Sequence, residues 1–120
     1  MTPEVLELVN AKVVYGTATV KDAGLLAAAV GRPFTVVSGL EVYPTIEEKA
    51  AALLHSVLRM RPFKEGNKST GWVAMRMMLR CHGKRPDLTG PQTYDLLARI
   101  DADELSVHEI VEALRVVADV

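Results

Sequence analysis

The sequence RPFKEGNKST occupies residues 61–70 and sets the arrangement of the segments on either side of it. Gly66 and Asn67, near its centre, are residue types that end or start helices. Residues 46–58, before it, place their apolar side chains on one helical face, whereas residues 67–82, after it, are apolar around most of the helix. The stretch is therefore predicted to join two helices, and the second is predicted to lie in the middle of the domain.

Helix-start signals recur along the rest of the chain. In chain order they are the pair Thr2-Pro3, Asp22, the capping box Thr45–Glu48, a site near residue 93 and the capping box Ser106–Glu109. The first helix should end near Val14 and the second at Gly31, and the apolar stripe of the last helix continues to Ala118. Five helices besides the one after the loop are therefore expected.

One extended segment interrupts this helical pattern. Residues 34–37 read Phe-Thr-Val-Val and are followed by Ser38-Gly39, which is typical of half a small hairpin or an ordered flap. No internal repeat or linker divides the chain. The prediction is a single, compact all-α domain of residues 1–120, with a short flap before the two helices that the loop joins.

The composition is that of a soluble globular protein, with 49% hydrophobic and 24% charged residues in 120. Cys81 is the only cysteine, so no internal disulfide is possible and a reducing compartment fits best. The acidic N-terminal stretch does not resemble a signal peptide, and no apolar run approaches the roughly 18 residues of a membrane helix. A cytoplasmic protein without a membrane partner is expected.

Positive charge is concentrated around the loop. Residues 59–85 contain eight basic side chains and one acidic one, a net charge of +7, so the rest of the chain carries −8. A general nucleic-acid binder would be basic overall and would expose stacking aromatics, so direct nucleic-acid binding is not expected. A compact anion such as a nucleotide phosphate is the more natural partner, and the alternative is a solvated basic helix face.

The loop itself has features of an anion site. The backbone N–H groups at a helix start are unpaired and carry partial positive charge, and Gly66 allows close approach of a ligand. Asn67 is placed to cap the helix, and Lys68 adds positive charge where an acid is usually preferred. Glu65 is placed to hold a divalent cation between phosphate oxygens. The alternative, an ordinary interhelical turn, leaves Lys68 unexplained.

The ten residues from Arg61 to Thr70 resemble the signature of the Fic/Doc superfamily, approximately H-P-F-x-[DE]-[GA]-N-[GK]-R-T. Seven positions agree: Pro62, Phe63, Glu65, Gly66, Asn67, Lys68 and Thr70. The flanking sequences also resemble the death-on-curing (Doc) branch, and the similarity extends over residues 5–83. The resemblance implies a Fic/Doc-like helical domain in which the flap docks a protein target.

The resemblance also implies a chemistry. Members of the superfamily transfer phosphate or a nucleotide from ATP or another nucleoside triphosphate, with Mg²⁺, to a protein hydroxyl. Glu65 would hold the Mg²⁺, and Phe63 would anchor the loop in the core. The implied phosphate-binding residues are Gly66, Asn67, Lys68 and Ser69, the implied catalytic positions are Arg61 and Lys68, and Pro62 and Thr70 are structural motif positions. Lysine at position 68 points to the Doc type, kinase-like toxins of elongation factor Tu that pair with an antitoxin acting in trans.

Two departures from the signature concern catalysis. Arg61 stands where the family has the histidine that takes the proton from the target hydroxyl, and a guanidinium cannot act as a general base. Ser69 stands where the family has a phosphate-binding arginine. Losing a general base costs about 10²- to 10⁴-fold in rate. The chain is therefore predicted to be weakened or silent in catalysis but still able to bind phosphate or nucleotide.

Two alternatives stay open at this point. The chain could be an active kinase or AMP-transferase toxin that uses a different base, or a helical interaction module that no longer binds nucleotide. His55 lies on a different helical face from Arg61, and His82 and His108 are placed at helix ends. All three are interpreted as structural residues, and they show no metal-ligand spacing with Cys81. Whether the chain is an enzyme is therefore left open by the sequence.

Overall fold

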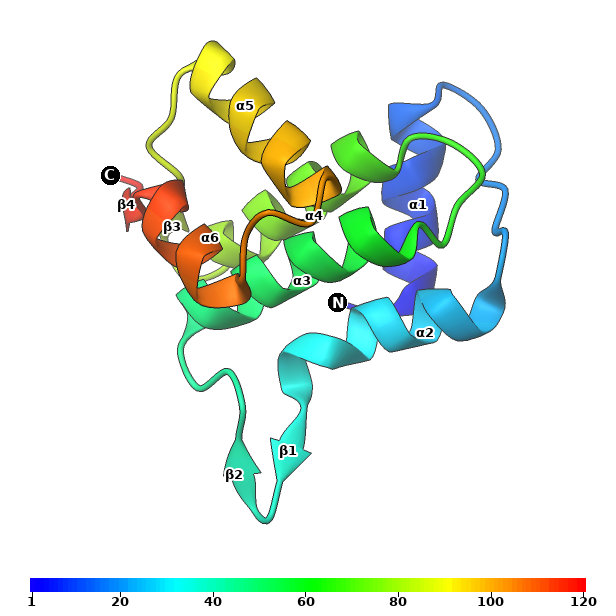
Figure 1. The fold of residues 1–120 in the computed structure, drawn as a ribbon. Helices are drawn as coiled ribbons and strands as arrows, with labels where there is room; N and C mark the ends of the chain where they lie inside the picture. The colour runs from blue at the N-terminus through cyan, green and yellow to red at the C-terminus, as the bar shows by residue number, and fades with distance from the viewer.

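The computed structural model describes residues 1–120, which fold as helices joined by short connections (Figure 1). The helices are α1 (Pro3–Val13), α2 (Ala23–Gly31), the 3-10 turn η1 (Arg32–Phe34), α3 (Ile46–Met60), α4 (Asn67–Arg80), α5 (Gly90–Asp101) and α6 (Val107–Leu114). The strands are β1 (Val36–Val37), β2 (Leu40–Glu41), β3 (Lys84–Arg85) and β4 (Val117–Ala118). The predicted all-α fold is confirmed.

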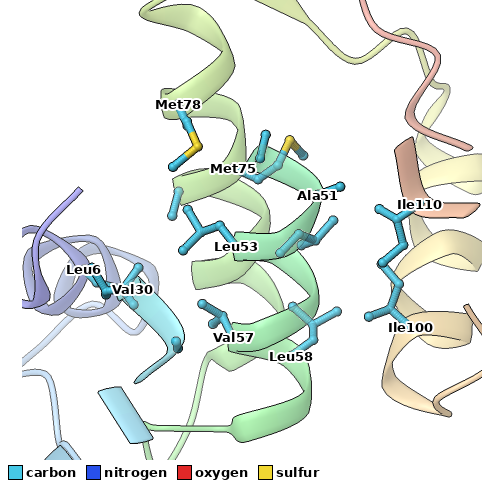
Figure 2. Close-up of a cluster of buried hydrophobic side chains, with 14 of the residues drawn as sticks. Leu6, Val30, Ala51, Leu53, Val57, Leu58, Met75, Met78, Ile100 and Ile110 are labelled. Atoms are coloured by element: carbon cyan, nitrogen blue, oxygen red, sulfur yellow. The ribbon is translucent and has the colours of Figure 1, made fainter. Parts of the chain in front are cut away.

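Helix α3 is the centre of the domain. Helices α2, α4, α5 and α6 all pack against it, and Figure 2 shows its side chains pointing to both sides. Leu53 points toward the side where α1 and α2 lie, and Leu58 points toward Ile100 of α5 and Ile110 of α6. The prediction that residues 67–82 form the central helix is wrong, because α4 buries one face against α1 and α3 while Arg76 on its other face is exposed.

Helices α3 and α4 approach closely at Gly71. A Cβ atom built on Gly71 would lie 2.6 Å from Leu58 Cδ1 and 3.3 Å from Val57 Cβ. No side chain fits there without movement of buried neighbours, because protein interiors are close-packed. The glycine thus fixes the separation of the two helices that carry the loop between them.

The helix starts follow the predicted caps with two differences. Thr2, Asp22, Thr45 and Ser106 each accept a hydrogen bond from the helix backbone as expected. The start of α5 is capped by a box of Thr89 and Gln92, earlier than predicted. The predicted capping box at Thr45 is only half formed, because Glu48 Oε1 accepts from the Thr45 hydroxyl (2.8 Å) and no longer serves the backbone N–H.

The two short antiparallel strand pairs differ in how well the sequence predicted them. The flap is confirmed in part: β1 and β2 pair antiparallel, with Val37 opposite Leu40, and lie exposed beyond the helices (Figure 1). Phe34, which was predicted to be extended, belongs to the 3-10 turn η1. The continuation of the last helix to Ala118 is wrong. Arg115 adopts a left-handed conformation (φ +51°) that ends α6, and β4 then pairs with β3. No helix of the fold has both the length and the apolar character that crossing a membrane requires.

Candidate functional site

The loop between α3 and α4, residues 61–66, is held by backbone hydrogen bonds to the segment before α2. Lys21 N donates to Pro62 O (2.7 Å), and Lys64 N donates to Thr19 O (3.0 Å). Phe63 lies between these bonds and is 1% exposed, so its ring is fixed in the core. We call residues 61–66 the motif loop. Backbone hydrogen bonds thus hold the motif loop on both sides of Phe63.

Asn10 of α1 holds the motif loop from the other side. Its Nδ2 donates to Glu65 O (2.9 Å) and to Thr70 Oγ1 (3.1 Å), and the side chain is buried. Gly66 adopts a left-handed conformation (φ +77°), and a Cβ on it would lie 2.7 Å from Val14 Cγ1. Sequence reasoning missed Asn10. The available signal was a polar residue on the apolar face of a helix, which needs a buried partner.

Asn67 has a different role from the predicted one. It was expected to cap α4, but its side chain turns back to the motif loop, where Oδ1 accepts from Phe63 N (3.1 Å) and Nδ2 donates to Phe63 O (2.8 Å). Gly66 occupies the cap position and has no side chain to offer. Asn67 therefore shapes the loop and leaves the helix start free.

Helix α4 is consequently the one α-helix that starts without a side-chain cap. The other α-helices are capped by Thr2, Asp22, Thr45, Thr89 and Ser106. Backbone N–H donors in the first turn of α4 are left for an external acceptor, and the helix dipole favours an anion there. Lys68, in that first turn, adds a full positive charge.

A cavity of about 330 Å³ opens at this helix start. It is lined by Leu58, Arg61, Lys64, Glu65, Gly66, Asn67, Lys68, Ser69 and Asp101. We call it the loop cavity. All the catalytic, phosphate-binding and metal-binding positions proposed from the sequence face it, while Pro62, Phe63 and Thr70 are buried behind it. Asp101, from the far end of α5, was not foreseen.

Asp101 bridges the two cations of the loop cavity. Arg61 Nη2 lies 2.5 Å from Asp101 Oδ1, and Lys68 Nζ lies 3.5 Å from Oδ2. Partial burial opposes ionisation of this carboxyl group, but the Arg61 hydrogen bond and the charges of Arg61 and Lys68 outweigh it and lower the pKa of Asp101. The carboxylate is thus ionised at neutral pH and occupies the position at which the two cations converge.

Other members of the basic cluster also find acidic partners. Arg59 Nε lies 3.7 Å from Asp103, Lys84 pairs with Glu47, and Arg85 lies near Asp87 and Asp119. The basic residues of this region that form no ion pair are Lys64, Arg76 and Arg80. The basic cluster therefore divides into charges that lie on a solvated face and charges that line the loop cavity.

Glu65 is the one predicted metal ligand. Its side chain is exposed, lines the loop cavity and forms no ion pair or hydrogen bond, so its carboxylate is available. No group of three or more potential metal ligands exists in the protein. Mg²⁺ commonly uses one or two carboxylates together with substrate phosphates and water. Glu65 therefore fits Mg²⁺ only as part of a metal–phosphate complex, not as a preformed metal site.

None of the histidines lines the loop cavity. His55 contacts Arg32, and because a guanidinium can only donate, His55 Nδ1 accepts and the ring is neutral. His82 Nδ1 lies 3.3 Å from Met78 O, and His108 pairs with Glu112. No imidazole stands near Arg61, so the only groups in the cavity that could accept a proton are the carboxylates of Glu65 and Asp101.

Comparison with known proteins found a matching family and a similar protein. A family model described as the Fic/DOC family matches residues 2–79. A protein named Toxin Doc, from Mycolicibacterium smegmatis, is 36% identical to this chain over 101 residues, which cover 82% of this chain and 78% of that protein. The family match includes α1, α2, α3, the motif loop and nearly all of α4. Asp101 lies beyond the matched residues.

Proposed function

The chain belongs to the Fic/DOC family, and from that membership we propose that it is a Doc-type toxin homologue whose loop cavity binds the phosphates of a nucleoside triphosphate with Mg²⁺. We further propose that its ability to transfer phosphate or a nucleotide is weakened or lost. The observation that carries the proposal is that Arg61 and Lys68 already hold an anion, the Asp101 carboxylate, at the uncapped start of α4.

Each part of the loop cavity has a role in phosphate binding. The first-turn N–H groups of α4 would donate hydrogen bonds to phosphate oxygens, and Lys68 would supply charge. The Ser69 hydroxyl can donate one further hydrogen bond. Glu65 would hold Mg²⁺, which neutralises phosphate charge when bound. The contacts of Asn10 and Asn67 keep the loop in place, so binding requires little ordering of the backbone.

The proposed loss of transfer follows from the side chains at two positions. In the transfer, the hydroxyl oxygen of the target bonds to phosphorus, the bond from phosphorus to the leaving phosphate oxygen breaks, and the hydroxyl proton goes to a base. Arg61 cannot take that proton. Ser69 offers one donor where a guanidinium would offer a fork to the charge developing on the transferred group. Substrate would therefore bind without efficient reaction.

A second candidate function is an active kinase or AMP-transferase. One observation favours it: the loop cavity contains an ionised carboxylate, Asp101, next to Arg61. In this alternative the target proton would pass to Asp101. Because the pKa of Asp101 is lowered, it would be a weak base and the reaction would be slow.

The partners are proposed by analogy with the relative's name. A Doc-type toxin would be held by an antitoxin acting in trans, and its target would be a protein hydroxyl, for which elongation factor Tu is the candidate. The exposed β1–β2 flap is the proposed target-docking element. A cytoplasmic location and the absence of a direct nucleic-acid partner belong to the same proposal.

Calorimetry with ATP and Mg²⁺ tests the binding proposal. We expect binding by the unaltered chain and at least about tenfold weaker binding by Lys68→Ala, because one charge-assisted contact to phosphate is lost. Arg80→Ala is the matched control: it removes a basic side chain from the same helix, outside the cavity, and should leave the affinity unchanged. Equal affinities in all three proteins would mean that the motif loop is only an interhelical turn and does not bind phosphate.

A further inference from the structure

We infer that Asp101 is a built-in occupant of the loop cavity that restricts it to ligands carrying several phosphate groups. A single phosphate must compete with the Asp101 carboxylate for Arg61 and Lys68. A polyphosphate has further oxygens that reach other donors at the same time. The inference rests on the proposed phosphate binding and names the class of ligand that the cavity selects.

The geometry is that of a bound anion. The two carboxylate oxygens face different cations, Oδ1 toward Arg61 (2.5 Å) and Oδ2 toward Lys68 (3.5 Å). Carboxylate and phosphate present the same kind of acceptor oxygen to such donors. An incoming phosphate that uses these cations therefore has to displace the carboxylate or share its partners.

The carboxylate is delivered by a backbone that is fixed independently of it. Ile100, the preceding residue, is fully buried in the core, and Asp101 O accepts a hydrogen bond from Arg59 Nη1 (2.5 Å). The Asp101 side chain is 23% exposed, against 53% for Arg61 and 53% for Lys68. Asp101 is thus placed by α5, and the two more exposed cations turn toward it.

The net charge of the loop cavity also favours a polyphosphate over a single phosphate. Its basic side chains are Arg61, Lys64 and Lys68, and its acidic ones are Glu65 and Asp101, so the side chains sum to +1. A lone phosphate dianion gains little from such a site. A triphosphate with Mg²⁺ brings the cation that satisfies Glu65, and it can place one phosphate on the helix start and another near Lys64. Removing the charge of Asp101 would raise the sum to +2 and free both cations.

The test compares inorganic phosphate with tripolyphosphate by calorimetry on the full chain. We expect the unaltered protein to bind tripolyphosphate and to bind phosphate weakly. Asp101→Asn keeps the size of the side chain and removes its charge, so the Kd for phosphate should fall about tenfold or more, and the preference for tripolyphosphate should shrink. Asp101→Glu keeps the charge, so it should bind phosphate less tightly than Asp101→Asn does.

Asp103→Asn is the matched control. It removes the same charge two residues away, where Asp103 faces Arg59 outside the cavity, and should not change phosphate affinity. Thermal unfolding shows whether the variants fold. If Asp101→Asn does not fold, Asp101→Ala takes its place, with the same expected fall in the Kd for phosphate.

The possible failures can be told apart. If Asp101→Asn and the unaltered protein bind phosphate equally, while Lys68→Ala still weakens tripolyphosphate binding, the role given to Asp101 is wrong and the phosphate site stands. If none of the proteins binds either ligand, both proposals are wrong.

Discussion

Asn10 and Thr70 are joined by a buried hydrogen bond of 3.1 Å between side chains 60 residues apart in the sequence. The same Asn10 amide group donates to Glu65 O, so α1 holds the motif loop and the first turn of α4 as one unit. Every buried polar side-chain atom of the protein has a hydrogen-bond partner. The first prediction tests how much this connection contributes.

Asn10→Ala should lower the free energy of unfolding by about 1–3 kcal/mol, because Glu65 O and the buried Thr70 hydroxyl lose their donor. Urea denaturation followed by circular dichroism measures the change. Lys12→Ala, an exposed position on the same helix, is the control and should stay within about 0.5 kcal/mol. A loss no larger than that of the control would mean that solvent replaces the amide without penalty.

Gly71→Ala should destabilise the protein by about 1–3 kcal/mol, because the added methyl group would overlap the Leu58 side chain between α3 and α4. Gly31→Ala makes the same change near the end of α2, where nothing lies within 4 Å of the added atom. That variant should be neutral or gain about 0.4–1 kcal/mol through the unfolded state. Similar unfolding midpoints for the two variants would contradict the close approach described for α3 and α4.

Arg61→His combined with Ser69→Arg should restore transfer, with a gain on the order of 10²- to 10⁴-fold over the unaltered chain. The histidine titrates near neutral pH and can take the hydroxyl proton, and the arginine supplies the missing fork. The effects should be non-additive because both groups act on one transition state. Labelled ATP, Mg²⁺ and a bacterial lysate provide the assay, with a labelled band expected near elongation factor Tu.

The single variants and the unaltered chain are the controls for that experiment. Strong labelling by the unaltered chain would favour the active alternative, and its loss in Asp101→Asn would identify Asp101 as the base. If the double variant binds ATP but labels nothing, the proposed target is wrong.

The stability of the protein should fall as the pH drops below about 6.5, partly because of His55. Burial, followed by the nearby charge of Arg32, lowers the pKa of His55 in the folded protein. The unfolded chain therefore takes up a proton that the folded state resists. The contribution of His55 to the free energy of unfolding is complete at pH values above the ordinary histidine pKa. It is lost as the pH falls through the lowered pKa of His55 in the folded protein.

His55→Gln isolates this effect, because its amide oxygen can still accept from Arg32 but does not titrate. Unfolding free energies measured from pH 8 to pH 5 should fall less steeply for this variant than for the unaltered chain. An identical slope in the two proteins would exclude His55 as a source of the pH dependence.

Local features of the sequence were sufficient for much of the fold. The caps at Thr2, Asp22 and Ser106 depend on side chains that bond backbone groups three residues away, and such contacts can be seen in the sequence. Helical periodicity predicted the helices. The contiguous motif predicted most of the residues that line the loop cavity, because neighbours in a tight loop must lie close together. The predictions at Ala118 and Asn67 were wrong because each residue forms its hydrogen bonds outside the helix. Ala118 pairs with β3, and the Asn67 side chain bonds the motif loop.

The sequence by itself determined that six helices form, where most of them start, and which loop between them is suited to an anion. Only the tertiary structure decided that α3 is the central helix, that Asn10 supports the loop and that Asp101 occupies its cavity. Asp101 follows Arg61 by 40 residues, and its position depends on how α5 packs against α3 through buried Ile100. Hydrophobic packing is non-directional and leaves no local sequence signal for which surface charges it brings together.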